Sequence, residues 1–475
     1  MRSIIWFRED LRLDDHPALL AASSGGAAVL PVFILDEEDP SLRAPGAASR
    51  WWLHGSLASL ARDLEARGSR LILMRGKSED ILRRLLAASG SCTIHATRLS
   101  APDAAARDER LIAAGLPLLL HDGATLFRPG SVRTGTGKCY LVFTPFWRAC
   151  LSLPPPPEPQ PAPKRILLPD QAPWGLALEE LELLPRPDWA SGLRARWTPG
   201  EGAALSRLDA FIDATLARYG RDRDYPGVAG TSRLSPHLHF GEMSIRRLWH
   251  RIIAAGATMN AGSGRDIERF LAEIGWREFA IHLLHARPDL VQAPMKPEFE
   301  DFPWRDDEEA FRRWCRGETG YPIVDAGMRE LWRTGHMHNR VRMIAASFLV
   351  KDLMIPWQRG EAWFWDTLVD ADAASNAMGW QWVAGSGPDA APFFRIFNPV
   401  SQGEKFDPDG HYVRHWLPEL ARLPDRFIHR PSEAPSRVLE AAGVRLGRDY
   451  PLPIVDHADA RRRALAAYDR VRRAA

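Results

Sequence analysis

The chain of 475 residues has only four cysteines, Cys92, Cys139, Cys150 and Cys315, and no two of them form a C-x-x-C pair. The sequence therefore predicts neither a disulfide framework nor a metal site, and this cysteine usage fits a reducing cytoplasm. The sequence also lacks an apolar run long enough to span a bilayer, and charges interrupt the N-terminal run MRSIIWFRED after a few apolar residues. We expect neither a membrane anchor nor a signal peptide.

Tyrosine is also scarce, with seven residues, whereas tryptophan is abundant, with 18. A buried indole needs a partner for its N–H, so this choice is costly for packing alone and indicates aromatic surfaces with a function. The 62 basic and 60 acidic residues leave a formal net charge of +2, which does not exclude a local basic face. The length and a hydrophobic fraction of 45% predict a globular protein of two or three domains.

The first part of the chain lacks the G-x-G-x-x-G fingerprint of dinucleotide-binding domains, yet it alternates strand patterns with helix patterns. Apolar residues at helical spacing run from Ser49 to Arg67, where Gly68 is a stop signal. This alternation predicts a parallel sheet that is covered on both faces. The five predicted strands are 4–7, 28–35, 70–74, 93–96 and 116–120.

A proline-dense stretch from Leu153 to Pro161 cannot form a helix interior or a central strand, and we interpret it as part of a linker. From about Ala195 onward the strand-like runs vanish, so the second domain is predicted to be nearly all helical. We expect domains at 1–126 and 196–475, joined by a linker over 127–195. The predicted helices of the second domain cover 205–219, 267–285, 310–315, 325–333, 339–353 and 362–368.

The segment from Gly230 to Pro236 places three hydroxyls and one guanidinium just before a helical pattern. Such groups, together with the free N–H groups of a helix start, suit a phosphate or pyrophosphate. An ordinary helix start, with Ser235 as the N-cap and Pro236 in the first turn, explains the same residues and is the commoner case. The segment alone does not decide between the two interpretations.

One predicted helix carries Phe270, Glu273 and Arg277 on a single face, with Trp276 beside them. An intrahelical ion pair next to a core aromatic is the commoner interpretation. A flat ring beside a carboxylate and a guanidinium also suits an unstacked base.

A second predicted helix places Asn339, Arg342 and Met343 on one face at the start of an apolar run. A buried guanidinium needs a carboxylate partner, and Asp370 and Asp372 are candidates downstream. Most buried ion pairs are architectural, so a structural role stays open.

The run 370–399 mixes acids, an amide, two tryptophans and several glycines, and it fits neither amphipathic period over its full length. We expect it to be irregular and to line a cavity, with a flat heteroaromatic cofactor as the natural occupant.

Five long motifs together resemble the DNA photolyase and cryptochrome family, most closely the bacterial cyclobutane pyrimidine dimer photolyases. They cover both domains in the expected order, and their specificity is high because they recur together. The motifs are WFREDLRLDDHPAL, GTSRLSPHLHFGEMS, EIGWREF, GYPIVDAGMREL followed by MHNRVRMIAASFLVKDL, and GWQWVAGSGPDAAPFFRIFNPVSQGEKFDPDG.

The resemblance implies a doubly wound, Rossmann-like α/β domain with a parallel five-stranded sheet, a long linker and an all-α domain that holds FAD. In the family's pattern, Tyr219 and the segment Thr231 to Ser235 hold the phosphates, and Arg342 pairs with Asp370. Asp372 meets the N3 edge of the flavin, and Asn376 lies beside N5, where it favours the reduced flavin. The implied cofactor-binding residues are Tyr219, Thr231, Ser232, Arg233, Leu234, Ser235, Phe270, Glu273, Arg342, Asp370, Ala371, Asp372 and Asn376.

The resemblance also implies a carbon–carbon lyase that repairs ultraviolet-damaged DNA by light-driven electron transfer from reduced, anionic FAD to a flipped-out pyrimidine dimer. A poorly stacked lesion costs less to extrude than a normal base pair, and aromatic rings replace the lost stacking. Glu273, Trp276, Asn339, Met343 and Trp382 are expected around the dimer, with Arg223, Arg277 and Arg340 near the DNA backbone. Glu273 is expected to hydrogen-bond the dimer and stabilise its reduced form.

Three tryptophans, Trp304, Trp357 and Trp380, stand where the family keeps its electron relay, although residue patterns alone favour a core role. Met343 stands where (6-4) photolyases have a second histidine, and Asn376 stands where plant cryptochromes have aspartate and animal ones cysteine. These residues, and the lack of a long C-terminal tail, favour a bacterial-type repair enzyme over a cryptochrome-like blue-light receptor that binds FAD without repair. A light-independent nucleotide-binding protein is a weaker alternative.

A second, antenna chromophore is where the resemblance gives no assignment. Folate-binding relatives place an amide and a glutamate where this chain has Asp103 and Ala104, which cannot make the same contacts. Folate bound differently, a deazaflavin, FMN or no antenna all stay open. We expect a cytoplasmic monomer without metal.

Overall fold

The computed structural model describes residues 2–89, 92–173, 175–259, 264–389 and 394–474. The chain falls into two compact units, which are described separately. Unit 1 comprises Met1–Ala217, Ser232–Pro288 and Val369–Ala374. Unit 2 comprises Arg218–Thr231, Asp289–Leu368 and Ser375–Ala475.

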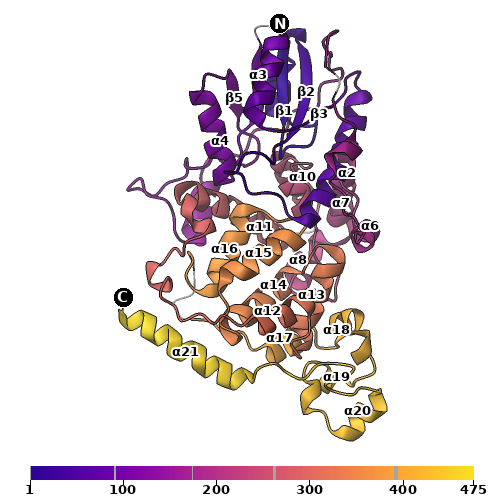
Figure 1. Cartoon of the computed structure of the whole chain (residues 1–475), viewed down its shortest axis with the longest axis vertical. Helices are drawn as coiled ribbons and strands as arrows, with labels where there is room; N and C mark the ends of the chain where they lie inside the picture. The colour runs from indigo at the N-terminus through magenta and orange to yellow at the C-terminus, as the bar shows by residue number, and fades with distance from the viewer. Residues whose placement is uncertain (1, 90–91, 174, 260–263, 390–393, 475) are drawn as a thin grey trace. The chain divides into compact units, whose positions relative to one another are not determined.

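Unit 1 contains a five-stranded sheet whose strands follow the order β3-β2-β1-β4-β5 and pair in parallel (Figure 1). The central strand β1 pairs with β2 on one side and with β4 on the other, which is the doubly wound arrangement that the sequence predicts. The strands are β1 (Arg2–Phe7), β2 (Ala28–Leu35), β3 (Ile72–Arg75), β4 (Thr93–Thr97) and β5 (Leu118–His121).

Successive residues of β1 point to opposite faces of the sheet, as the two-residue period of a strand requires. Ile5 and Phe7 join a core that includes Leu19 of α1 and Trp52 of α2. Ile4 and Trp6 join a second core with the apolar residues of α3 and α4. The sheet is therefore buried on both faces, and its strands are continuous apolar runs because neither face meets water.

The helices of unit 1 include one, α2, that the sequence predicts to within two residues at each end, with Gly68 in a left-handed conformation after it (φ +77°). The long α11 carries several predicted site residues. The helices are α1 (Pro17–Ala22), α2 (Ala47–Glu65), α3 (Ser78–Ser89), α4 (Pro102–Ala113), α5 (Phe143–Leu151), α6 (Ser191–Arg196), α7 (Glu201–Ala214), α9 (Ser235–His239), α10 (Ile245–Thr258) and α11 (Gly264–Ala286).

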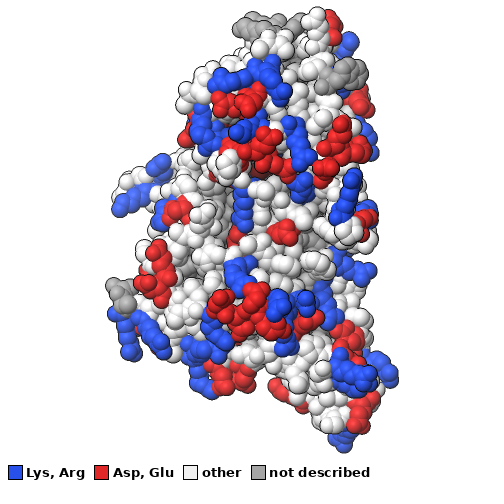
Figure 2. All heavy atoms as spheres, viewed as in Figure 1, with Lys and Arg blue, Asp and Glu red and all other residues white. Residues whose placement is uncertain are grey.

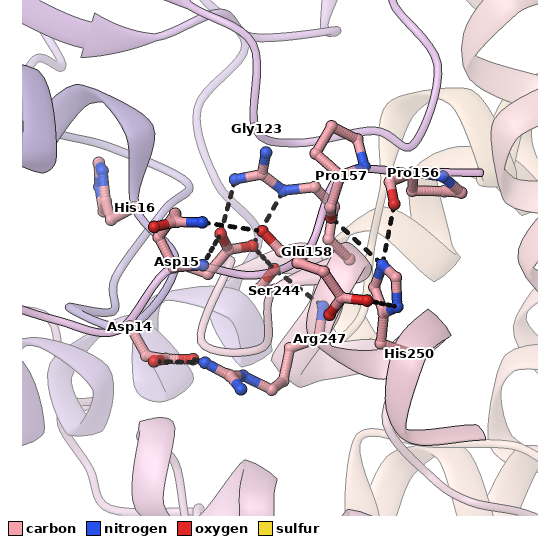
Figure 3. A network of polar contacts seen from close by, with 12 residues as sticks. Asp14, Asp15, His16, Gly123, Pro156, Pro157, Glu158, Ser244, Arg247 and His250 are labelled. Carbon is pink, nitrogen blue, oxygen red and sulfur yellow. Dashed lines mark hydrogen bonds and ion pairs between the residues drawn. The ribbon is translucent and has the colours of Figure 1, made fainter. Parts of the chain in front are cut away.

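The proline-dense segment is hydrogen-bonded to the rest of unit 1 (Figure 3). Asp15 and Gln160 exchange two bonds: the Asp15 N–H donates to the Gln160 carbonyl at 2.8 Å, and the Gln160 N–H donates to Asp15 Oδ1 at 2.9 Å. His250 of α10 lies with Nε2 at 2.9 Å from the Pro156 carbonyl oxygen and Nδ1 at 3.2 Å from Glu158. The prolines keep this segment out of regular secondary structure, so its carbonyl oxygens need other partners. A side chain of α10 provides one.

Residues after the prolines complete one core of the sheet. Ile166, Leu181 and Leu193 are fully buried and belong to the same cluster as Trp52. Trp197 meets the Trp52 ring edge to face at 5.4 Å. The segment predicted as a linker therefore supplies apolar cover to the α/β part of unit 1.

The regular elements in the described residues of unit 2 are helices, and some of them begin at capping residues or at a proline. The Asp307 side chain accepts from the Ala310 N–H at the start of α12, and Pro322 opens α13. The helices are α8 (Tyr219–Asp222), α12 (Glu308–Arg316), α13 (Pro322–Thr334), α14 (Asn339–Ser347), α15 (Trp357–Thr367), α16 (Ala373–Ala384), α17 (Pro399–Phe406), α18 (His411–Trp416), α19 (Asp425–Ile428), α20 (Ser436–Ala442) and α21 (His457–Ala474), and α16 begins in the last residues of unit 1.

Two local predictions differ from the structure. The helix predicted over 339–353 is α14 followed by a π-helix, Phe348–Asp352, a form that single-residue periodicity does not reveal. The run 370–399, predicted to be irregular, forms α16 over much of its first half. Small and apolar residues make up most of α16, so its sequence shows no clear contrast between an apolar and a polar face; residues 390–393 of the run lie outside the described residues.

In the part of the chain that the structure describes, no helix is both long and apolar enough to cross a membrane.

Candidate functional site

The predicted phosphate segment adopts an unusual backbone. Arg233 has a positive φ of 53°, which costs energy for a residue with a side chain and is typical of functional loops. The following helix, α9, starts at Ser235, but Leu234 occupies the N-cap position and makes no side-chain cap. The predicted cap by Ser235 is therefore wrong.

The Ser235 hydroxyl instead donates to Asp370 Oδ2 at 2.6 Å. Asp370 is buried, with 8% of its surface exposed, and a carboxylate in such a place is stable only when it is hydrogen-bonded or paired. Because Ser235 uses its proton on Asp370, its oxygen faces a ligand only as an acceptor. Two residues 135 positions apart in the chain, both predicted to bind the cofactor, thus form one polar pair.

Asp372 lines a recess of unit 1 together with Glu9, His239 and Arg277. Burial raises the pKa of Glu9; the nearby His239 opposes this shift, and the negative charge of Asp372 adds to it. Glu9 was not predicted as a site residue, because its place directly after β1 gave no chemical pattern. Ala371, between the two predicted acids, is buried.

Asn376 of α16 has a defined orientation in unit 2. Its amide nitrogen donates to the Glu361 carboxylate at 2.8 Å and to the Glu361 backbone carbonyl at 3.1 Å. Both partners are acceptors, so the nitrogen and oxygen of the amide are assigned by the network. The amide N–H groups are used within the protein, and the carbonyl oxygen is the group left to meet a ligand donor.

Helix α11 presents Glu273 and Trp276 at a half-buried position in unit 1. The Trp276 ring lies 3.8 Å from the Phe143 ring of α5 at an interplanar angle of 8°, a face-to-face stack. Phe270 is buried, and its ring lies 4.8 Å from that of Phe211, so its described ring contact is a core contact of unit 1.

Arg277 donates from Nη1 to the Ala124 carbonyl at 2.8 Å. The next residue, Glu278, is fully buried, and its carboxylate accepts from the Leu126 and Phe127 N–H groups at 3.1 Å. These two residues hold the chain that follows β5 against α11.

The pKa of Glu278 is raised from its ordinary 4.5 to about 7, chiefly by burial, while Arg277 and the two N–H groups oppose the shift. Between these values the folded protein keeps a proton that the unfolded chain has released. Stability from this group is therefore fully present below pH 4.5 and is lost as the pH rises to 7, by up to about 3 kcal/mol.

Glu278→Gln should remove this dependence. We expect the thermal midpoint of the parent protein, compared between pH 5 and pH 8, to fall more than that of the variant, because glutamine has no proton to lose. Equal falls in the two proteins would contradict the assignment. Thermal unfolding followed by circular dichroism in matched buffers measures both.

Helix α14 of unit 2 begins at the exposed Asn339 and is capped by His338, whose Nδ1 accepts from the Arg340 N–H at 3.2 Å. Burial lowers the pKa of His338 to about 4, so the ring is neutral at pH 7 and can accept. Arg342, half-buried one turn on, donates from Nε to the Met337 carbonyl at 2.7 Å. Met343, also half-buried, follows it on the helix.

Arg340 belongs to a basic cluster in unit 2, together with Arg223 and Lys405. It pairs with Asp224 at 2.9 Å and lies over the Phe406 ring at 4.3 Å, with Lys405 over the same ring at 5.1 Å. Arg223 lies over the buried Tyr219 ring at 5.2 Å.

On the face drawn in Figure 2, basic and acidic side chains are interspersed.

Comparison with known proteins decides the family. Residues 3–164 match the family model described as DNA photolyase, and residues 270–470 match the model described as FAD binding domain of DNA photolyase. The chain is 51% identical over 475 residues to the Deoxyribodipyrimidine photo-lyase of Agrobacterium fabrum, which covers 99% of this chain and 98% of the relative. The chain belongs to the DNA photolyase and cryptochrome family.

Other members of the family agree with this result. The crystal structure of a bacterial class III photolyase from Agrobacterium tumefaciens has 50% sequence identity and a TM-score of 0.95, and the match covers 99% of this chain and 98% of that one. Cryptochrome-1 of Arabidopsis thaliana is 41% identical over 97% of this chain and 69% of its own length. The predicted fold, a parallel α/β domain followed by a helical FAD-binding domain, is confirmed.

The relay tryptophans of the photolyase pattern lie in unit 2. Trp357 and Trp380 are both buried, and Trp304 is half-buried. The Trp380 ring meets Phe364 at 5.0 Å and Trp314 at 6.2 Å, and it lies so close to Gly360 that a Cβ there would be 2.1 Å from it. α15 and α16 therefore fix the Trp380 ring.

In the described part of the chain, no group of three or more histidine, cysteine, aspartate or glutamate residues could hold a metal ion. Three residues that sequence analysis missed support predicted ones: Glu361 orients Asn376, Glu278 fastens α11, and Phe143 stacks on Trp276. Glu278 lies within the motif EIGWREF, where this residue was given no role, and Glu361 and Phe143 lie outside the five motifs.

Proposed function

We propose that this protein is a light-driven DNA repair enzyme, a deoxyribodipyrimidine photo-lyase that splits cyclobutane pyrimidine dimers. The observation that carries the proposal is the 51% identity, end to end, with a protein of that name. The FAD-binding domain model over residues 270–470 supports FAD as the cofactor. When bound in its reduced form, FAD supplies the electron on absorption of light.

We assign the phosphate-binding role to Tyr219 and the segment from Thr231 to Ser235, and the flavin-binding role to Arg342, Asp370, Asp372 and Asn376. The Arg233 backbone conformation and the Ser235–Asp370 hydrogen bond support a built polar site. The free carbonyl oxygen of Asn376 is the acceptor that a protonated flavin N5 needs. A carbonyl at that position favours the reduced flavin over the oxidised one, which has no N5 proton.

The lesion, in this proposal, lies against Glu273, Trp276, Asn339, Met343 and Trp382, with Arg223, Arg277 and Arg340 near the DNA backbone. The exposed position of Asn339 and the half-buried positions of Glu273 and Trp276 support this role, because these side chains reach the surface. Arg277 and Arg340 already bond Ala124 and Asp224, so each would offer DNA only its remaining N–H groups.

The decisive experiment uses purified protein with chemically reduced FAD and a thymine-dimer oligonucleotide. Under blue light we expect the absorbance of intact thymine to return, whereas the dark sample and an undamaged oligonucleotide should stay unchanged. A holoprotein that binds FAD but leaves the dimer intact would support the second candidate, a cryptochrome-like blue-light receptor, which the 41% identity to Cryptochrome-1 favours.

Glu273→Gln should lower repair per absorbed photon by about tenfold, because the variant replaces the carboxyl group that is proposed to hydrogen-bond the dimer. FAD content and dimer binding should stay near the parent values. Glu268→Gln is the matched control, since Glu268 is an exposed residue of the same helix. Unchanged repair per photon in Glu273→Gln removes Glu273 from the mechanism.

A cytoplasmic location, a monomeric state and an antenna chromophore remain parts of the proposal. Asp103, one of two residues at the family's folate-binding positions, accepts hydrogen bonds from the Arg43 and Ala104 N–H groups at 2.7 and 2.8 Å. A folate held in the usual way would have to displace these bonds. The absorption spectrum of the native holoprotein tests for any antenna, because an antenna would add absorption to that of the flavin.

A further inference from the structure

Helix α5 lies in the segment predicted as a linker. It contacts Trp276, which the proposed function places against the lesion. The Phe143 ring covers one face of the Trp276 indole, with centroids 3.8 Å apart and planes 8° from parallel. Phe279 meets both rings edge to face, at 5.9 Å from Trp276 and 6.0 Å from Phe143. The indole plane is thus fixed from one face and one edge.

Phe143 is itself held in place by the packing of α5 on α11. At Gly275, directly before Trp276, a Cβ would lie 2.6 Å from the Trp147 ring, so only glycine lets α5 approach this closely. Trp147 also meets Trp249 of α10 edge to face at 6.1 Å. Phe143 is 9% exposed and Trp147 8%, so both rings are buried.

We propose that Phe143 is a positioning residue for lesion recognition: it holds the Trp276 indole in the plane that an everted pyrimidine dimer stacks on. The inference rests on the proposed function, in which Trp276 contacts the dimer. Trp276 is half-buried, so part of its surface remains accessible. A residue of the predicted linker thereby supports a residue of the proposed lesion site.

The physical reason is pre-organisation. An unsupported indole loses rotational freedom when a base stacks on it, and immobilising one such side chain weakens binding by about three- to tenfold. A ring already fixed by Phe143 avoids this loss. Phe143 also fills the space beneath the indole, so a base can stack from one side only.

The test measures the ratio of affinities for a thymine-dimer duplex and the same undamaged duplex, at fixed salt, with FAD-loaded holoprotein. Phe143→Leu should lower this ratio by about three- to tenfold, while affinity for undamaged DNA stays unchanged. Phe143→Tyr, which keeps the ring, should restore it. If the leucine variant loses FAD, Phe143→Met takes its place, because it also removes the ring but is a milder change. The expected fall in the ratio is the same.

Phe146→Leu is the matched control. Phe146 is also buried on α5 and its ring contacts Phe279 and His282, but no described ring contact joins it to Trp276. This variant should lose thermal stability and keep the affinity ratio. If Phe146→Leu lowers the ratio as much as Phe143→Leu does, or if Phe143→Leu keeps the parent ratio, the inference is overturned.

Trp276→Leu distinguishes a failure of the positioning role of Phe143 from a failure of the proposed lesion contact of Trp276. If it loses discrimination and Phe143→Leu does not, the positioning role fails and the proposed lesion contact stands. If Trp276→Leu keeps full discrimination, the lesion contact fails and the inference fails with it. Repair of the dimer under light would still establish the proposed enzyme in either case.

Discussion

Trp380→Phe is expected to abolish light-driven reduction of bound, oxidised FAD, with a rate at least about tenfold lower than in the parent protein. Phenylalanine fits the space against Gly360 and Phe364, so the fold should survive, but its ring is far harder to oxidise than an indole. Loss of the flavin's blue absorbance during illumination with an external thiol measures the rate. After chemical reduction of FAD, repair by the variant should equal that of the parent.

Trp314→Phe is the matched control for this experiment. Trp314 is fully buried, its ring lies 6.2 Å from that of Trp380, and its indole N–H donates to the Ala345 carbonyl at 3.0 Å. The residue lies outside the predicted relay, so its variant should keep photoreduction. Rapid photoreduction in Trp380→Phe, or its loss in Trp314→Phe alone, would show that electrons follow another route.

Asp370→Asn is expected to weaken FAD binding by about 10- to 100-fold, the range for a hydrogen bond to a charged group. Asparagine keeps an oxygen that accepts from Ser235 and removes only the charge, so the change separates ion pairing from hydrogen bonding. Ser235→Ala removes only the neutral donor and should cost about fivefold. FAD retained per protein after dialysis, followed by reconstitution with added FAD, measures both.

Ser206→Ala is the control for the serine variant, because the Ser206 hydroxyl donates to the Gly202 carbonyl on an exposed part of α7. It should leave FAD content unchanged. Full retention of FAD by Asp370→Asn would mean that the Ser235–Asp370 bond serves the fold of unit 1 and not the cofactor.

The sequence predicts the sheet of unit 1 well, because its strands are short apolar runs bounded by turns and its helices have clear periodicity. The predicted strand 28–35 has the observed bounds, and the others agree to within about two residues. The alternation of strands and helices predicts parallel pairing. It gives the order of the strands only once it is known that the chain crosses to the other side of β1 part-way through the sheet.

Local chemistry was harder to predict where distant partners compete for a side chain. Ser235 has the residue type of a cap, yet the buried Asp370 draws its hydroxyl away from the helix start. The run 370–384 hid a helix, because small and apolar residues make up most of α16 and its sequence shows no clear polar face. For Ser235, by contrast, a tertiary contact overrode the local pattern.

The candidate residues could be predicted mainly through the family resemblance, since composition and periodicity left each of them open to a structural interpretation. The residues that orient them could not be predicted from the sequence. Glu361 lies 15 positions before Asn376, and Phe143 lies 133 positions before Trp276. Only the folded chain brings such partners together.

The apolar cover that residues 166–197 lay over the sheet decides where this chain can be divided. A domain swap with its boundary near residue 126, where the composition changes, would remove Ile166, Leu181 and Trp197 from around Trp52. It would expose the hydrophobic residues beneath them to water. Chimeras of this protein with its relatives must therefore carry residues 127–197 along with the sheet.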